Sequence, residues 1–304
     1  LISNLHDMKN RGDLKTEQQN PNSKNIGTME IKEILATINN EDSTISSAVK
    51  KVIPSIENAV NYTVNSIKSG GRVFYVGAGT SGRLGVLDAS EIPPTFSAED
   101  NLFIGIIAGG EKALTHSVEG AEDDSKSIRD DLGKYSINEN DTIIGISCSG
   151  AAEFVIGALE YAKNFGAKTI YLVTNPTPFL ITKVDIIIHA DTGPEVITGS
   201  TRMKAGTATK MILNMISTTT MIKLGKVYNN LMIDLMAVNN KLVDRGARII
   251  EQLTLLDYSA AKQLLMDADK SVKIAIVMHH FNCDIHQARI KLNGVNGFIQ
   301  DLID

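Results

Sequence analysis

Five short runs of apolar residues recur along the middle of the chain, and each run is apolar at consecutive rather than alternate positions. Runs of this kind are typical of strands buried on both faces of a parallel sheet. The predicted strands are Val73–Val76, Leu102–Ile107, Thr142–Ile146, Thr169–Val173 and Ile186–His189. Because helix-length segments separate them, we expect an α/β fold with a five-stranded parallel sheet flanked by helices. Ligands of such sheets bind at the carboxyl ends of the strands.

Helical periodicity predicts the elements around this sheet. Apolar residues from Ile31 to Ile38 fall on one face of a first helix. Further helices are expected at 44–68, 112–134, 153–165, 177–183, 229–256 and, as a cluster of short helices, 259–304. A long helix reaching about Lys226 is expected to begin near Ser200 or Thr201, either of which is a suitable N-cap.

The start of the chain is polar and aperiodic, unlike the rest. Residues 1–27 are rich in Asn, Lys, Gln and Asp and predict an extended or partly ordered arm, which could cover a neighbouring subunit. The domain boundaries that we expect are 1–69 for the N-terminal arm and helices, 70–228 for the sheet domain and 229–304 for a C-terminal helical region.

A glycine-rich turn, Gly77–Gly82, follows the first predicted strand and leads directly into a helix-period pattern. The N–H groups of the helix start and two hydroxyls then point at one place, where the helix dipole favours an anion such as phosphate. The residues expected to bind phosphate are Gly79, Thr80, Ser81 and Gly82. Pro93 and Pro94 are expected to stop the helix, which puts Glu91 at or just beyond its last turn.

The glycines of this turn also satisfy the G-x-G-x-x-G spacing of dinucleotide-binding folds, which is a weak signal by itself. A dinucleotide site needs an acidic residue about 20 positions further on, at the end of the second strand. Here that strand ends in Ala108-Gly109-Gly110, and Glu111 comes only after the glycines. The hydroxyls of the turn therefore favour a compact phosphomonoester, such as a sugar phosphate, over a dinucleotide.

The third predicted strand ends in a second turn of the same kind, in which the hydroxyls of Ser147 and Ser149 meet the start of a helix. Another polar segment, 193–204, precedes the long helix. Its candidate ligand-binding residues are Glu195, Ser200, Thr201 and Lys204. Arg202 and Lys204 could be exposed to solvent or could bind an anion, and the sequence pattern does not decide between these two roles.

Carboxylates gather in the loop between the second and third strands. Residues 119–124 contain four of them, and Glu119 and Glu122 lie three apart, on one face if the segment is helical. An acidic run is usually a solvated surface, so a chemical role requires a cleft around one of these carboxylates. The spacing alone does not choose between Glu119 and Glu122. Glu91 could likewise be a solvated surface carboxylate or a catalytic group. It belongs to the helix whose start is expected to bind phosphate.

The composition argues against several classes of function. The 304 residues carry a net charge of −5 and no basic cluster, which argues against nucleic acid or an anionic membrane as a partner. Cys148 and Cys283 are isolated and the histidines lack metal-ligand spacing, so neither a disulfide framework nor a metal site is expected. Without a leader or an apolar run of about 18 residues, the cytoplasm is the expected location.

Four long motifs resemble one family. They are GAGTSGRLGVLDASEIPPTF from Gly77, IIAGGEKALTHSVEGAEDD from Ile106, GPEVITGSTRMKAGTATKMILNMIS from Gly193 and GKVYNNLMIDLMAVNNKL from Gly225. The glycine and hydroxyl turns resemble the sugar isomerase (SIS) domain, a phosphosugar-binding fold. The motifs as a set are similar to the N-acetylmuramic acid 6-phosphate etherases. The resemblance runs from about Leu14 to the end of the chain and is far more specific than a three-glycine spacing.

Membership of that family implies a lyase-type reaction of peptidoglycan recycling. The D-lactyl ether at C3 of N-acetylmuramic acid 6-phosphate would be cleaved to D-lactate and N-acetylglucosamine 6-phosphate, without a metal or redox cofactor. The resemblance assigns the acid to Glu91, in DASE, and the second catalytic glutamate to Glu122, in EGAED. Because the chain holds a single SIS domain, it also implies a homodimer in which each site is completed by the neighbouring subunit.

One turn departs from the family pattern. After Gly150 the family has a basic residue and then Thr, whereas this chain has Ala151, Ala152 and Glu153. We expect weaker binding of the substrate phosphate or a shifted substrate preference, with the chemistry retained. Two alternatives keep the fold: a phosphosugar-sensing regulator without catalysis, and an aldose–ketose isomerase with Glu195 as its base.

Overall fold

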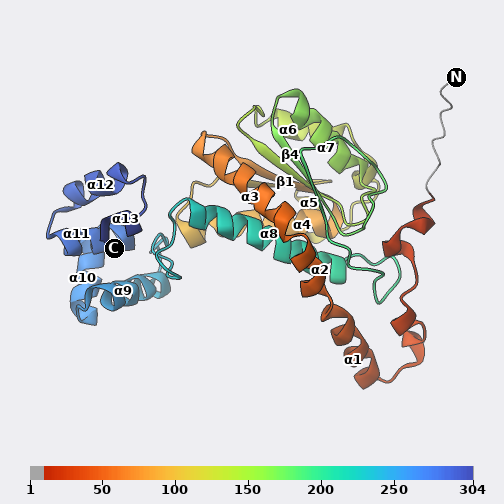
Figure 1. Ribbon diagram of the computed structural model, residues 1–304, viewed down its shortest axis with the longest axis horizontal. Helices are drawn as coiled ribbons and strands as arrows, with labels where there is room; N and C mark the ends of the chain where they lie inside the picture. Colours follow the sequence, from red (N-terminus) through yellow and green to blue (C-terminus); the bar gives the residue numbers. More distant parts are fainter. Residues whose placement is uncertain (1–9, 304) are drawn as a thin grey trace. The chain divides into compact units, whose positions relative to one another are not determined.

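The structure, a computed structural model, describes residues 10–303 (Figure 1). It contains a five-stranded parallel sheet in the order β2-β1-β3-β4-β5. The strands are β1 (Val73–Gly77), β2 (Phe103–Ile107), β3 (Thr142–Ile146), β4 (Lys168–Val173) and β5 (Ile186–His189). The predicted strands and the α/β fold are thereby confirmed. Because β1 lies between β2 and β3, the turns that follow these three strands are neighbours.

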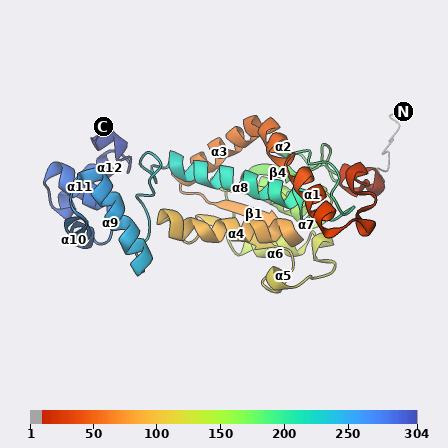
Figure 2. The ribbon, with the colours of Figure 1, turned by 90° about the horizontal axis from the view of Figure 1, so that it is seen from below.

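Helices cover both faces of the sheet (Figures 1 and 2). One face carries α6 (Ser127–Gly133) and α7 (Glu153–Asn164), and the other carries α3 (Ile53–Lys68), α4 (Gly79–Phe96) and α8 (Lys204–Lys223). The core on the α7 side contains buried apolar residues that include Phe74, Val76, Ile143, Phe154 and Leu159. Glycine allows a close approach there, since a Cβ built on Gly145 would lie 2.7 Å from a side-chain carbon of Val155.

The N-terminal arm is folded onto its own chain from residue 10 onwards. It forms four short 3₁₀ turns, Arg11–Asp13, Lys15–Glu17, Pro21–Ser23 and Ile26–Thr28, and continues into α1 (Ile31–Asp42) and α2 (Ile45–Lys51). The Lys15 N–H donates to Asn175 Oδ1 at 3.2 Å, and the Ser23 hydroxyl donates to the Val196 carbonyl at 2.7 Å. These bonds tie the arm to the loops after β4 and β5, so residues 10–27 are more ordered than the extended or partly ordered arm that the sequence predicts. Residues 1–9 of that arm lie outside the described residues.

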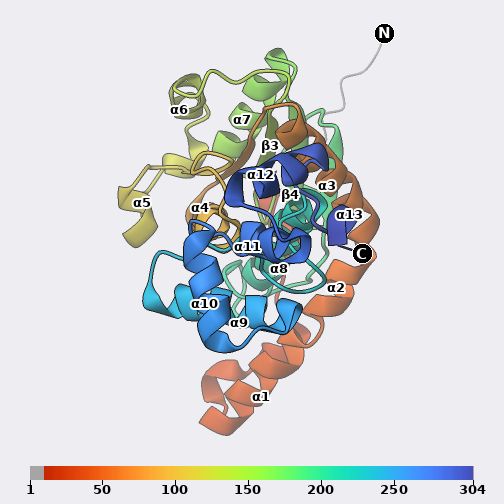
Figure 3. The same ribbon diagram turned by 90° about the vertical axis from the view of Figure 1, so that its left-hand side faces the viewer.

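Residues 10–89 and 103–216 group into one compact unit, and residues 90–102 and 217–303 group into a second. The helices of the second unit are α9 (Asn240–Thr254), α10 (Tyr258–Asp267), α11 (Val272–Phe281), α12 (Ile285–Gly294) and α13 (Gln300–Ile303), shown in Figure 3. Its buried core includes Ile233, Ile250, Leu265 and Ile276. Lys273 is only 7% exposed and forms an ion pair of 2.7 Å with Asp234.

Several predicted helices differ from the structure. The helix predicted at 44–68 is divided at Val52 into α2 and α3. The segment 112–134 is broken into α5 (Lys112–Thr115), a 3₁₀ turn at Ala121–Asp123, and α6. The predicted helix at 177–183 is wrong, because the N–H groups of residues 179 and 180 donate to carbonyls of the turn after β3. The predicted helix at 229–256 begins only at Asn240, where the side chain of Asn239 caps α9.

Helix α4 is longer than the sequence pattern predicts. It continues through Pro93 and Pro94 to Phe96, so Glu91 lies inside the helix and not at its end. The fixed φ of proline fits a helix, although each ring removes one N–H group and crowds the carbonyl four residues earlier. Helix α4 contains both prolines despite this cost. The prediction that the prolines stop this helix is therefore wrong.

Candidate active site

Two glycines close the turn between β1 and α4. A Cβ built on Gly77 would lie 2.7 Å from the backbone N of Gly82, and a Cβ on Gly82 would lie 2.6 Å from the Gly77 carbonyl oxygen. Gly79, with a φ of +54°, is the first residue of the 18-residue helix α4. Thr80 is half-buried and Ser81 is buried. The predicted turn thus places N–H groups and hydroxyls at the positive end of a long helix dipole.

The turn after β3 lies against the turn after β1. The Ser81 hydroxyl and the Cys148 thiol are 3.4 Å apart, and either group could donate. The Cys148 carbonyl accepts the N–H and the hydroxyl of Thr174, at 3.0 and 3.1 Å. Burial raises the pKa of the Cys148 thiol, which keeps it uncharged. The predicted hydroxyl residues at the adjacent ends of β1 and β3 are Thr80, Ser81, Ser147 and Ser149.

Glu195 caps the start of α8. Its two carboxylate oxygens accept the N–H groups of Lys204 and Ala205 at 3.0 Å each, and the residue is fully buried. Burial raises the pKa of Glu195, and the two backbone hydrogen bonds oppose the rise. The side chain of Glu195 therefore accepts the free N–H groups at the start of α8, the role that the sequence pattern assigns to Ser200 or Thr201.

Lys204 is held inside the fold. Its ammonium group lies 2.6 Å from Glu41 Oε2 of α1, and Asn20 and Asn22 donate to the same carboxylate at 2.7 and 2.8 Å. Burial alone would raise the pKa of Glu41, but the hydrogen bonds from Asn22, Lys204 and Asn20 outweigh burial and lower it. The predicted ligand-binding lysine is thus engaged in a buried ion pair.

The start of α8 also touches the turn after β1. A Cβ built on Gly206 would lie 3.4 Å from Thr80 Cγ2 and 3.9 Å from the Thr201 carbonyl oxygen. Ser200 and Thr201 are half-buried in the turn before α8, whereas Arg202 is exposed. The structure therefore places Thr201 near the predicted phosphate turn and leaves Arg202 in solvent.

A cavity of about 250 Å³ lies beside the start of α4. Its lining includes Gly79 and Arg83 of α4, and Glu119 and Glu122 of the loop after β2. Within that loop, the Ser117 hydroxyl donates to Glu119 Oε1 at 3.1 Å. The structure thereby brings Glu122 and the N-terminus of α4 into one cavity.

Arg83 is a cavity residue that the sequence pattern does not single out. Its Nε donates to the Leu114 carbonyl at 3.1 Å and its Nη2 donates to the His116 carbonyl at 3.0 Å. These carbonyls would otherwise continue α5, so their use by Arg83 accompanies the break in the predicted helix at 112–134. A cation one helical turn after Gly79 is the sequence signal that points to this residue.

Glu91 does not share this cavity. It is exposed and lies twelve residues along α4 from Gly79, a helical rise of about 18 Å. That distance exceeds the length of a hexose phosphate. A sugar whose phosphate was bound at the start of α4 could not reach Glu91 of the same helix.

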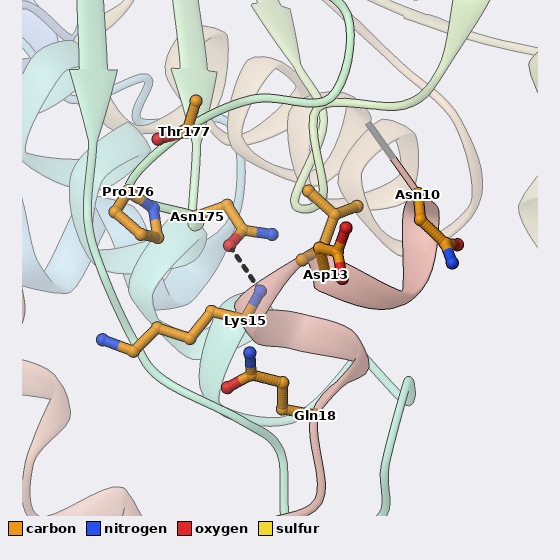
Figure 4. Close-up of a pocket in the computed structure, with 8 residues that line it drawn as sticks. Asn10, Asp13, Lys15, Gln18, Asn175, Pro176 and Thr177 are labelled. Atoms are coloured by element: carbon orange, nitrogen blue, oxygen red, sulfur yellow. Dashed lines mark hydrogen bonds between the residues drawn. The ribbon is translucent and has the colours of Figure 1, made fainter. Parts of the chain in front are cut away.

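A second cavity, of about 440 Å³, lies where the N-terminal arm meets the loop after β4 (Figure 4). The residues of the arm that line it are Asn10, Asp13, Leu14, Lys15 and Gln18, and those of the loop are Asn175, Pro176 and Thr177. The dashed line in Figure 4 is the bond from the Lys15 N–H to Asn175 Oδ1. None of the predicted site residues lines this cavity.

Residues 10–303 contain no group of three or more His, Cys, Asp and Glu side chains that could hold a metal ion. Over the same residues, no helix has the length and apolar character needed to cross a bilayer. The groups that the structure offers at the ends of β1, β2 and β3 are hydroxyls, backbone N–H groups, a guanidinium and carboxylates.

Two family models match the chain. The model of the glucokinase regulatory protein N-terminal SIS domain matches residues 55–163, and the model of the SIS domain matches residues 124–219. Among solved structures, a phosphoheptose isomerase from Neisseria gonorrhoeae is similar over 63% of this chain and 98% of its own, with a TM-score of 0.48 and 15% identity. The match to the SIS domain agrees with the phosphosugar-binding fold that the motifs predict.

Relatives at much higher identity cover almost the whole chain. The N-acetylmuramic acid 6-phosphate etherase of Oceanobacillus iheyensis is 52% identical over 94% of this chain and 98% of its own. The etherase of Rhizobium rhizogenes is 46% identical over 100% of this chain and 97% of its own. These matches confirm the resemblance carried by the motifs, and the protein belongs to the N-acetylmuramic acid 6-phosphate etherase family.

Proposed function

We propose that this protein is a carbon–oxygen lyase that cleaves the D-lactyl ether of N-acetylmuramic acid 6-phosphate, giving N-acetylglucosamine 6-phosphate and D-lactate. The observation that carries the proposal is the cavity lined by both Glu122 and the N-terminus of α4. Relatives 46% and 52% identical to the chain are named for this activity. The reaction would serve peptidoglycan recycling, and a cytoplasmic location stays a prediction of the sequence.

The substrate phosphate is assigned to the turns after β1 and β3. Backbone N–H groups at the start of α4 and the positive end of its dipole favour a dianion. Hydroxyls complete the proposed phosphate site without adding charge. They come from Thr80, Ser81, Ser147 and Ser149.

The chemistry requires two carboxyl groups in opposite protonation states. In the ring-opened sugar, the aldehyde at C1 makes the C2 proton acidic. We assign its removal to ionised Glu122, after which the C3–O bond breaks as the C2=C3 double bond forms. Protonated Glu91 then gives its proton to the departing lactate oxygen. Water finally adds across the double bond, with its hydroxyl on C3 and its proton on C2.

A homodimer would bring the two glutamates together. In one chain the rise of α4 separates Glu91 from Gly79 by about 18 Å. A second copy could present its own Glu91 to the cavity that contains Glu122, since a twofold axis makes the same contact twice. We therefore propose that each site takes Glu122 from one subunit and Glu91 from the other.

The structure argues more strongly against an isomerase than against a non-catalytic regulator. An isomerase would need Glu195 as a base facing the sugar, yet both of its oxygens accept backbone N–H groups and the residue is fully buried. A non-catalytic regulator is compatible with the match to the glucokinase regulatory protein model at residues 55–163. The presence of both Glu91 and Glu122 argues against it, and release of lactate would decide.

The test is incubation of the protein with N-acetylmuramic acid 6-phosphate and measurement of D-lactate. Glu91→Gln and Glu122→Gln should each lower kcat by about 100-fold or more, the usual contribution of a general acid or base. Glu119→Gln, a change in the same loop, should cause a much smaller loss. Unchanged lactate release by both Glu91→Gln and Glu122→Gln would remove the proposed mechanism, and no release by the wild type would favour the regulator.

A further inference from the structure

We infer that Arg83 forms a carboxylate subsite that binds the lactyl group of the substrate, apart from the site of its phosphate. This inference rests on the proposed function, because only an ether that carries a hydroxy acid presents a second anion. It adds a specificity residue to the two proposed catalytic glutamates.

The guanidinium of Arg83 is fixed by the main chain. Nε and Nη2 each donate one hydrogen bond, to the carbonyls of Leu114 and His116. Of the five N–H donors of a guanidinium, these bonds use two and leave three. Neither bond neutralises the cation, since the acceptors are uncharged carbonyls. The side chain is thus oriented while part of its donor set remains available to a ligand in the cavity that it lines.

No carboxylate of residues 10–303 forms an ion pair with Arg83. Glu119 and Glu122 line the same cavity, so acidic side chains are near without forming such a pair. An arginine that is half-buried, held by two carbonyls and unpaired is suited to an anionic ligand.

The first turn of α4 points its polar groups in two directions. The Ser81 hydroxyl contacts Cys148 after β3, and Thr80 lies near Gly206 at the start of α8. Arg83 instead contacts the segment after β2, and both Arg83 and Glu122 line the cavity. Two anions of one ligand could therefore occupy separate places around this turn, with the hydroxyls taking one and the guanidinium the other.

The chemistry of the ligand decides which anion goes to Arg83. The lactyl carboxylate is two bonds from the ether oxygen at C3, and C3 is next to C2, where Glu122 is proposed to act. The phosphate on C6 lies at the opposite end of the sugar. A guanidinium also matches a carboxylate through two parallel hydrogen bonds. The lactyl carboxylate is thus the anion that can reach the cavity shared by Arg83 and Glu122.

Calorimetry on Arg83→Gln tests the inference without relying on turnover. Binding is measured in a Glu122→Gln background for N-acetylmuramic acid 6-phosphate and for N-acetylglucosamine 6-phosphate, which has the phosphate but no carboxylate. Arg83→Gln should raise the Kd for N-acetylmuramic acid 6-phosphate by about 10- to 100-fold, the range for hydrogen bonds to a charged group. It should raise the Kd for N-acetylglucosamine 6-phosphate by less than about twofold. Arg129→Gln, which changes an exposed arginine of α6, is the matched control and should alter neither.

Equal weakening of both ligands would assign Arg83 to the phosphate and overturn the inference, and so would unchanged binding of both. If Arg83→Gln does not fold, Arg83→Lys replaces it, because lysine keeps the charge and loses the two-pronged donor. Its binding of the muramic acid ligand should still fall about fivefold or more, and an unchanged value would overturn the inference. The proposed function fails separately, through absence of lactate release by the wild-type protein.

Discussion

The ammonium group of Lys204 and the carboxylate of Glu41 lie 2.6 Å apart in a part of the fold where both residues are buried. Asn20 and Asn22 also donate hydrogen bonds to the Glu41 carboxylate, so this group connects the N-terminal arm, α1 and α8. Removing one member of such a pair leaves an uncompensated buried charge, which costs far more than losing a surface pair.

Glu41→Gln should lower the free energy of unfolding by about 3 kcal/mol at pH 7. The pKa of Glu41 in the folded protein is lowered from its ordinary value of 4.5. The unfolded chain therefore binds more protons in the window below pH 4.5, and stability rises with pH across it. The contribution of the charge is present above pH 4.5 and is lost as the pH falls through the folded pKa. The difference between wild type and variant should shrink accordingly, as measured by urea unfolding at several pH values.

The control is Asp131→Asn, which removes an exposed pair with Lys134 of similar length, 2.8 Å. Solvent screens that pair, so its loss should cost about 1 kcal/mol or less. A difference for Glu41→Gln that persisted unchanged below pH 4 would show that the carboxylate charge is not what stabilises this part of the fold.

Helix α7 begins at Glu153 without a side-chain cap, because its N-cap residue is Ala152. Ala152→Thr should raise the free energy of unfolding by about 1 kcal/mol, since a threonine hydroxyl can accept a free N–H of the first turn. The same hydroxyl would lie in the turn after β3, where the substrate phosphate is proposed to bind. One added hydrogen bond to the phosphate should lower the KM for N-acetylmuramic acid 6-phosphate by about two- to tenfold. Thermal unfolding and steady-state kinetics measure the two effects.

Ala152→Val is the matched variant, because valine has the shape of threonine without the hydroxyl. It should reproduce neither effect. If Ala152→Val lowered KM as much as Ala152→Thr, packing rather than hydrogen bonding would explain the change. The expectation that Ala152, in place of the family's Thr, weakens phosphate binding would then be wrong.

At the scale of elements, strands were easier to predict than helices. Consecutive apolar residues such as Ile143 and Ile144 have one sufficient explanation, burial on both faces of the sheet. Residues 177–183 have helical periodicity, yet the N–H groups of Phe179 and Leu180 bond to the turn after β3, which no local pattern reveals. In the segment before α9, Ile233, Leu235 and Ala237 are buried at every second position, an alternation that does not fit a helix.

At the scale of the whole molecule, the proposal that each site takes Glu122 from one subunit and Glu91 from the other can be tested by mixing variants. Mixing Glu91→Gln with Glu122→Gln should restore activity that neither variant has alone. In a one-to-one mixture half of the dimers are mixed, and one of their two sites has both glutamates, so about a quarter of wild-type lactate release is expected. The mixture should be unfolded and refolded together so that subunits exchange.

Each variant refolded by itself is the control and should stay inactive. No recovery in the mixture, with mixed dimers demonstrated by a tag on one variant, would mean that both glutamates of a site come from the same chain. A monomer in size-exclusion chromatography under assay conditions would contradict the shared site directly.

The candidate site was only partly predictable, because the sequence reveals residue types but not their distant partners. The turn at Gly77–Gly82 and the choice of Glu122 rest on local motifs, and the structure places both beside one cavity. Glu195 and Lys204 have the chemistry of ligand-binding residues, but their bonds are to a helix start and to Glu41, 163 residues away. Distant pairing of this kind has no signature in a single sequence.

The guanidinium of Arg83 is held by two backbone carbonyl oxygens, a group that every amino acid has. Over generations the side chains at 114 and 116 could be exchanged without removing that support. The turn between β1 and α4 has no such freedom, because at Gly77 and Gly82 not even a methyl group fits. The residues that support Arg83 are thus open to evolutionary drift, while the two glycines of the turn are closed to it.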